Sequence, residues 1–131
     1  MVPEKTVVAT IGRDAYATRL ETPSHIVMAD EPVKDGGKDI GPQPFDFLRM
    51  SLASCTAITL RMYADRKGWG VEQIQVTIST EQVGGKTIFH RVLEISGSID
   101  EHQRKRLLQI ANACPIHKVL TNPIEVQTLI T

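Results

Sequence analysis

The longest hydrophobic pattern in the chain runs from Pro44 to Lys67. Apolar side chains occur there in every direction around a helix of 3.6 residues per turn, and a few charged residues are interspersed among them. A helix that is apolar on all sides is either buried or spans a membrane, and the interspersed charges favour burial. The pattern therefore predicts a long central helix of a soluble core, ended by Gly68.

The segment before this helix predicts short strands. β-prone residues at 6–11, 15–20 and 25–28, with turn-forming residues between them, are typical of an antiparallel meander of two or three strands. The stretch from Glu31 to Pro44 is rich in glycine, proline and charge and has no hydrophobic period, so it predicts a loop.

The segment after the helix predicts a hairpin, a second helix and a closing strand. Residues 73–82 and 89–95 alternate on either side of Gly84-Gly85, a pair that suits a two-residue turn with positive φ. Asp100 and Gln103 have the spacing of a capping box before a second helix. The residues expected on the inward face of this helix are Leu107, Leu108, Ala111 and Cys114. Alternation from Ile124 to Ile130 predicts the closing strand.

The chain length limits how this helix can be covered. A chain of 131 residues is expected to form one domain, and so small a domain can hardly wrap a long apolar helix on all sides. We therefore expect the chain to assemble as an intertwined homodimer.

Charge and terminal sequence narrow the classes of partner. The 15 basic and 15 acidic side chains cancel, so no overall field attracts nucleic acid or an anionic membrane. The N-terminus lacks the pattern of a secretory signal, and no apolar run approaches the roughly 18 residues of a spanning helix. We expect a cytoplasmic protein with neither nucleic-acid nor membrane partners.

The chain has two cysteines, Cys55 and Cys114, far apart in sequence. Free cysteines often serve as small buried apolar residues. Pro115 favours a different interpretation, because proline suits the first turn of a helix, and a thiol just before such a turn faces unpaired N–H groups that stabilise a thiolate. A transient catalytic disulfide is compatible with the cytoplasm. The pair therefore suggests dithiol redox chemistry.

Two segments carry a family resemblance. The sequence from Gly41 to Trp69, which includes Cys55, and the sequence Cys114-Pro-Ile-His117 resemble the OsmC/Ohr family of osmotically inducible and organic hydroperoxide resistance proteins. The resemblance covers nearly the whole chain. It implies one OsmC-like domain over residues 1–131 with a two-layer α+β fold. That fold has an N-terminal meander, a long buried central helix, a second β-hairpin and helix, and an intertwined dimer.

The resemblance also implies a function. Cys55 is then the thiol that attacks an organic hydroperoxide, and Cys114 resolves the sulfenic acid as a disulfide before further oxidation. An external dithiol, a lipoylated protein in the family, restores the pair, and no cofactor is required. The alternative is a non-catalytic or redox-sensing member that binds a small apolar ligand at the dimer interface.

Family members also use an arginine to hold the thiolate and a glutamate to orient it. Arg13 matches a Gly-Arg motif of the hydroperoxide-resistance branch, with Arg19 as the reserve and a solvated strand arginine as the alternative. Phe45 occupies the position of the glutamate, and the acid appears one residue later as Asp46. Asp46 either takes that role, complements the helix dipole or pairs with Arg49.

Two further interpretations concern His117. It either raises the thiolate fraction of Cys114 or simply caps and packs. With Cys114, Cys55 and a distant histidine it is also compatible with zinc, although structural zinc sites usually draw on a second short-spaced ligand pair that is missing here. The sequence therefore favours no metal.

Overall fold

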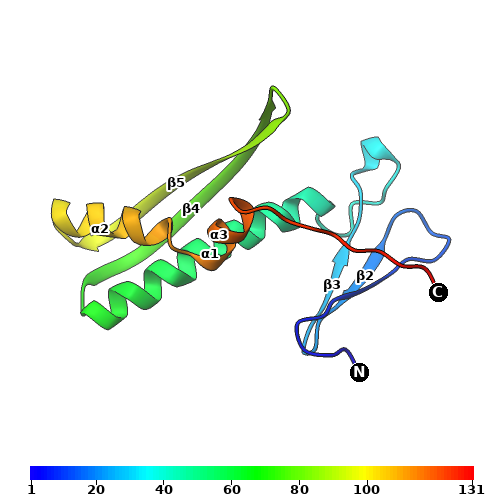
Figure 1. Cartoon of the computed structure of the whole chain (residues 1–131), viewed down its shortest axis with the longest axis horizontal. Helices are drawn as coiled ribbons and strands as arrows, with labels where there is room; N and C mark the ends of the chain where they lie inside the picture. The colour runs from blue at the N-terminus through cyan, green and yellow to red at the C-terminus, as the bar shows by residue number, and fades with distance from the viewer. The chain divides into compact units, whose positions relative to one another are not determined.

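The computed structural model describes all 131 residues, and the chain divides into two compact units, Met1–Leu48 and Arg49–Thr131 (Figure 1). Each unit contains one small antiparallel sheet, and the chain has three α-helices. The α+β class is therefore confirmed, as is the predicted order of meander, long helix, hairpin and second helix.

The first unit contains the meander. Strands β1 (Val8–Thr10), β2 (Thr18–Glu21) and β3 (Ile26–Ala29) pair in the order β1-β2-β3. The predicted strands exist, but β1 and β2 begin later than expected, and the connection between them takes up residues 11–17. The predicted loop from residue 31 to residue 44 contains one short 3₁₀ helix, η1 (Val33–Asp35).

A single carboxylate organises the loop of the first unit. Asp30 is only 2% exposed. Its two oxygens accept hydrogen bonds from the backbone N–H groups of Tyr16, Glu31, Lys38 and Ile40. Burial by itself would raise the pKa of Asp30, but these four hydrogen bonds outweigh it and the pKa is lowered. A stretch with no hydrophobic period is thus ordered by polar contacts.

Helix α1 (Pro44–Lys67) has the predicted bounds. It ends in a Schellman motif, in which the N–H of Gly68 donates to the carbonyl of Asp65 and the N–H of Trp69 donates to the carbonyl of Ala64. Gly68 has a φ of +69°, a conformation that glycine adopts without a Cβ clash. The glycine therefore ends the helix where the sequence predicted.

The second unit is built on a long hairpin, drawn in green in Figure 1. Strand β4 (Gly70–Val83) pairs with β5 (Lys86–Ser98). Gly84 and Gly85 connect them with φ values of +56° and +77°, as a type I′ turn requires. The hairpin is therefore confirmed, with strands longer than predicted at both ends.

Two short helices follow the hairpin. Asp100 and Gln103 form the predicted capping box at the start of α2 (Glu101–Ala111). The chain then turns, and α3 (Pro115–Leu120) begins with a proline in its first turn. The predicted inward face is confirmed for Leu107 and Ala111, which are fully buried, but was wrong for Leu108, which is 59% exposed. One residue turns a side chain by about 100° around a helix, and Leu108 therefore lies outside the narrow stripe that Leu107 and Ala111 bury.

The core of the second unit lies between α1, the hairpin and α2. It consists of Leu60, Ala64, Val71, Leu107 and Ala111. Within one chain, α1 buries a single stripe, which consists of Leu52, Thr56, Leu60 and Ala64. The opposite stripe of Met50, Ile58 and Met62 is 42%, 53% and 60% exposed. Burial on all sides of α1, which the sequence predicted, is therefore not reached by a single chain.

The predicted closing strand was wrong. Residues 123–131 form no strand, and Ile124, Val126, Leu129 and Ile130 are between 63% and 98% exposed. Alternation makes a segment suitable for a strand, but a strand also needs a neighbour for its backbone N–H and C=O groups, and β4 and β5 pair only with each other.

None of the helices has both the length and the apolarity needed to cross a bilayer.

Candidate active site

Cys114 occupies the position just before helix α3. It is fully buried, and its Sγ accepts a hydrogen bond from the backbone N–H of His117 at 3.3 Å. Pro115 takes the first helical position, where its missing N–H leaves no donor unpaired. The sulfur thus caps the helix, as the Cys-Pro sequence predicted.

Helix α1 brings the other cysteine to the same place. Thr56 is fully buried on the inner stripe of α1, and its Oγ1 lies 3.8 Å from the Sγ of Cys114. Cys55, the residue before Thr56 on α1, is partly exposed, and its thiol is near enough to Cys114 to help lower the pKa of that sulfur. The fold therefore brings together the two cysteines that the sequence singled out.

The surroundings of Cys114 favour its thiolate. Burial by itself would raise the pKa of this thiol. The N–H of His117, the hydroxyl of Thr56, the thiol of Cys55 and the charge of Arg91 act in the opposite direction and together lower the pKa. Cys114 is therefore a buried thiol that ionises more readily than an ordinary cysteine.

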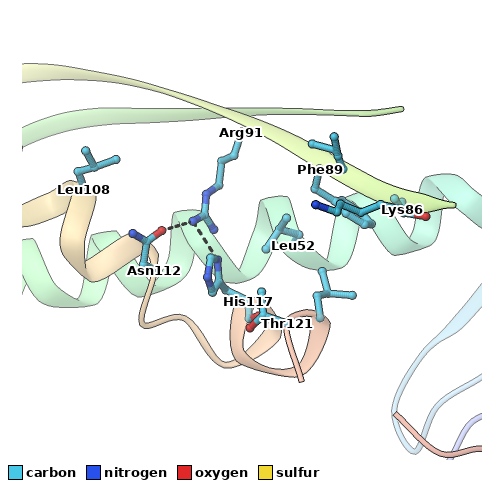
Figure 2. A pocket seen from close by; sticks show the side chains of 11 residues that line it. Leu52, Lys86, Phe89, Arg91, Leu108, Asn112, His117 and Thr121 are labelled. Atoms are coloured by element: carbon cyan, nitrogen blue, oxygen red, sulfur yellow. Dashed lines mark hydrogen bonds between the residues drawn. The ribbon is translucent and has the colours of Figure 1, made fainter. Parts of the chain in front are cut away.

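Arg91 connects the elements around this thiol, and Figure 2 shows its contacts with Asn112 and His117. From β5 its Nη1 donates to the Oγ1 of Thr56 at 3.1 Å. Its Nη2 donates to the Oδ1 of Asn112 at 2.8 Å and to the Nδ1 of His117 at 3.1 Å. One guanidinium thus joins α1, the end of α2 and α3.

His117 is held as a neutral ring. Burial lowers its pKa, and the positive charge of Arg91 lowers it further. The backbone of His117 binds the sulfur of Cys114 while its ring contacts Arg91. The sequence left open whether the ring raises the thiolate fraction or packs, and in the structure the group that contacts the sulfur is the backbone N–H.

A cavity of about 490 Å³ adjoins this network. Arg91, Asn112 and His117 line it together with apolar side chains that include Leu52, Phe89, Leu108 and Leu120. Figure 2 shows the three polar side chains gathered beside Leu52, with Phe89 and Lys86 farther along the strand. Such a cavity suits a small ligand with an apolar body and a group that accepts hydrogen bonds.

The other predicted site residues belong to the first unit. Arg13 is exposed in the connection between β1 and β2, and Arg19 on β2 pairs with Glu21. Asp46 lies in the first turn of α1, next to Phe45. The roles of Arg13 and Asp46 toward Cys55 remain predictions. No group of three histidine, cysteine or acidic side chains has a metal-binding arrangement.

Sequence reasoning missed Arg91, Thr56 and Asn112. Arg91 did leave a signal, since it shares one face of β5 with Phe89, Leu93 and Ile95, and a charged residue in such a row needs buried partners. Thr56 and Asn112 left none, because hydroxyl and amide side chains are common in helices.

Comparison with known protein families shows to which family the chain belongs. Residues 36–129 match the family described as OsmC-like protein. The chain belongs to the OsmC family. A search of curated proteins found no match.

Solved structures share the OsmC-type fold of this chain. An OsmC-like protein from Mycoplasma pneumoniae has a TM-score of 0.74 at 18% identity, over 92% of this chain and 89% of that one. The organic hydroperoxide resistance protein OhrB of Bacillus subtilis has a TM-score of 0.60 at 19% identity, over 88% and 89%. An organic hydroperoxide resistance protein OsmC from Legionella pneumophila has a TM-score of 0.63 at 18% identity, over 88% of both chains.

Proposed function

We propose that this OsmC-family chain is a thiol peroxidase that reduces organic hydroperoxides through Cys55 and Cys114. The observation that carries the proposal is the proximity of the two cysteines: Thr56, the neighbour of Cys55 on α1, has its Oγ1 3.8 Å from the Sγ of Cys114. The Cys114 sulfur is buried and Cys55 is partly exposed. Two neighbours of similar fold are named organic hydroperoxide resistance proteins. A partly exposed thiol can meet a peroxide, and a buried thiol beside it can resolve the product.

The reaction has two oxidative steps. The Cys55 thiolate attacks one peroxide oxygen, the O–O bond breaks, and the other oxygen leaves as the alcohol after it gains a proton. Cys114 then attacks the sulfur of the Cys55 sulfenic acid, and the hydroxyl group leaves as water. An external dithiol reduces the disulfide in the cytoplasm.

The cavity beside Arg91 is the proposed place for the organic part of the peroxide. Its apolar lining complements a hydrocarbon group, and Arg91 and Asn112 supply polar contacts at one side. Arg13 is the proposed arginine for the Cys55 thiolate, and Asp46 the proposed carboxylate. A homodimer is proposed as well, because the stripe of Met50, Ile58 and Met62 stays exposed in a single chain.

A second function is a ligand-binding protein without peroxidase activity. The observation that favours it is Phe45, an apolar residue where the family's peroxidases carry glutamate. In that case the cavity holds a small apolar ligand, and the cysteines serve packing or redox sensing.

Thiol counting distinguishes the two functions. The reduced protein is mixed with one equivalent of cumene hydroperoxide, and free thiols are counted over time. A peroxidase loses both of its two thiols promptly, whereas a binding protein loses them slowly or not at all. Cys55→Ser should abolish peroxide consumption, and Cys114→Ser should permit one turnover and then stall as sulfenic or over-oxidised acid. If Cys55→Ser keeps the first turnover and Cys114→Ser loses it, the two roles are reversed.

A further inference from the structure

The two sulfurs of the site differ in access. Cys114 is fully buried, and Cys55 is partly exposed on α1. In thiol-disulfide exchange the incoming thiolate attacks one sulfur and the other leaves, and the outcome depends on access and on the pKa of the leaving thiol. Access therefore favours attack at Cys55, with Cys114 as the sulfur that leaves.

Thr56 carries a hydroxyl that can respond to the charge on Cys114. Its Oγ1 accepts a hydrogen bond from Arg91, and its single hydrogen donates to the carbonyl of Leu52 at 2.7 Å. Rotation about the C–O bond turns that hydrogen toward the Sγ of Cys114, 3.8 Å away. When Cys114 is a thiol, its S–H can donate to Oγ1. When it becomes a thiolate, the hydroxyl can donate to sulfur instead.

Arg91 fixes the direction of this hydroxyl. Its Nη1 donates to one acceptor position of Thr56, while its Nη2 contacts Asn112 and His117. The guanidinium is thus hydrogen-bonded to the Thr56 hydroxyl, which in turn can donate to the Sγ of Cys114. Its charge favours a developing thiolate at Cys114 through Thr56.

We propose that Arg91 is a positioning residue that makes Cys114 the leaving thiolate when the Cys55–Cys114 disulfide is reduced, so that the reductant bonds to Cys55. This inference rests on the proposed redox function of the pair. A thiolate of the external dithiol attacks the Sγ of Cys55, the S–S bond breaks, and its electron pair goes to the Sγ of Cys114. The second thiol of the reductant then attacks the mixed disulfide and releases Cys55. The dithiol loses two electrons and two protons, and the two cysteines gain them.

The test uses the disulfide form and no peroxide. The full chain is oxidised with diamide, the oxidised protein is mixed with glutathione, and the mixed disulfide is trapped with acid and located by peptide mass spectrometry. We expect glutathione on Cys55. In Arg91→Met the first exchange step should slow by roughly tenfold, and Arg91→Lys, which keeps the charge, should recover part of the rate. Arg106→Met is the matched control, because Arg106 contacts Tyr63 and Gln109 instead.

A second readout separates charge from access. In a Cys55→Ser background, the ultraviolet absorbance of the thiolate is followed as the pH is raised. Arg91→Met and Thr56→Val should each raise the apparent pKa of Cys114, and Thr56→Ser, which retains the hydroxyl, should not. If Arg91→Met does not fold, Thr56→Val still carries the test, since it breaks the same link and leaves Arg91 in place.

Three results would overturn the inference. They are glutathione found on Cys114, failure of the two cysteines to form the disulfide, and an unchanged exchange rate and Cys114 pKa when the link from Arg91 to Thr56 is broken. The last result would mean that access alone directs the exchange. A protein that exchanges as expected but consumes no hydroperoxide would contradict the proposed peroxidase and leave the role of Arg91 standing.

Discussion

Arg91 donates a hydrogen bond to the ring Nδ1 of His117, with 3.1 Å between the two nitrogens. A guanidinium has donors and no acceptor, so Nδ1 must carry a lone pair, and the proton of the neutral ring resides on Nε2. The pKa of His117 is lowered by burial and by the charge of Arg91, in agreement with a neutral ring. The contact is therefore compatible only with an uncharged imidazole.

Acidification should destabilise the fold through His117. Its pKa in the folded protein lies below the ordinary value of about 6.5, so between the two values the unfolded chain binds more protons than the folded one. The free energy of unfolding should therefore fall as the pH drops through the ordinary value of about 6.5 toward the lower pKa of the folded protein. His117→Gln, which cannot take up this proton, should flatten that part of the profile, as measured by urea unfolding at a series of pH values.

The control for this prediction is His102→Gln, which removes a histidine from the exposed first turn of α2. It should leave the slope of the wild-type profile in place. Equal flattening in both variants would contradict the assignment to His117.

Asp30→Asn should destabilise the loop of the first unit. The amide has a single oxygen to offer the four N–H groups that Asp30 accepts, so some of these donors lose their acceptor. The pKa of Asp30 is lowered, so its stabilising effect is present above the ordinary pKa of aspartate and is lost as the pH falls through the folded value. The variant should therefore differ most from wild type near neutral pH and least in strong acid.

Thermal unfolding and amide hydrogen exchange at Lys38 and Ile40 measure this difference. Asp35→Asn alters an exposed carboxylate in the same loop and serves as the control. Equal exchange rates in wild type and Asp30→Asn at neutral pH would show that the carboxylate does not order the loop.

The sequence predicted the parts of the fold that depend on near neighbours. The capping box of Asp100 and Gln103 and the turn at Gly84-Gly85 are set by residues within a few positions, so they can be recognised without the rest of the chain. The closing strand from Ile124 to Ile130 failed because its pattern says nothing about a pairing partner.

For the candidate site, the sequence predicted the two cysteines but not the polar side chains that surround them. Cys55 and Cys114 stand out because the chain has two cysteines and one of them precedes a proline. The contacts of Arg91 join residues up to 35 positions apart, and no local pattern encodes such separations. A charged residue in the apolar row of β5 marks a polar cluster but does not name its members.

If Arg13 is the arginine that holds the Cys55 thiolate, as proposed, Arg13→Ala should slow the reaction of Cys55 with an organic hydroperoxide by about tenfold, because removal of a neighbouring cation disfavours the thiolate. Stopped-flow measurement of thiol oxidation gives the rate. Arg19→Ala is the control, since Arg19 pairs with Glu21. If Arg13→Ala is oxidised at the wild-type rate and Arg19→Ala is oxidised slowly, then Arg19 is the arginine that holds the Cys55 thiolate.

The double change Phe45→Glu with Asp46→Leu should raise the same rate, because it restores the acid to the family's position. Asp46→Asn alone should then change little. A large loss in Asp46→Asn would instead mean that the shifted carboxylate already orients the arginine.

Met62→Glu should convert a dimer into monomers. Met62 belongs to the exposed stripe of α1, and a charge buried there against a second copy would weaken dimerisation by roughly a hundredfold. Light scattering at low micromolar concentration measures the mass of each form. Val83→Glu, at the exposed end of β4, is the control, and a folded wild-type monomer would rule out the dimer.

The hairpin has a consequence for how the chain folds at high concentration. Strands β4 and β5 are 14 and 13 residues long, more than twice the usual length of about 6, and each leaves one edge unpaired. A long free edge is a template for pairing with another chain. The rate of this intermolecular pairing rises with chain concentration, whereas the rate of folding to the native hairpin does not. Recovery of native protein after dilution from denaturant should therefore fall as chain concentration rises, with the loss appearing as β-rich aggregate.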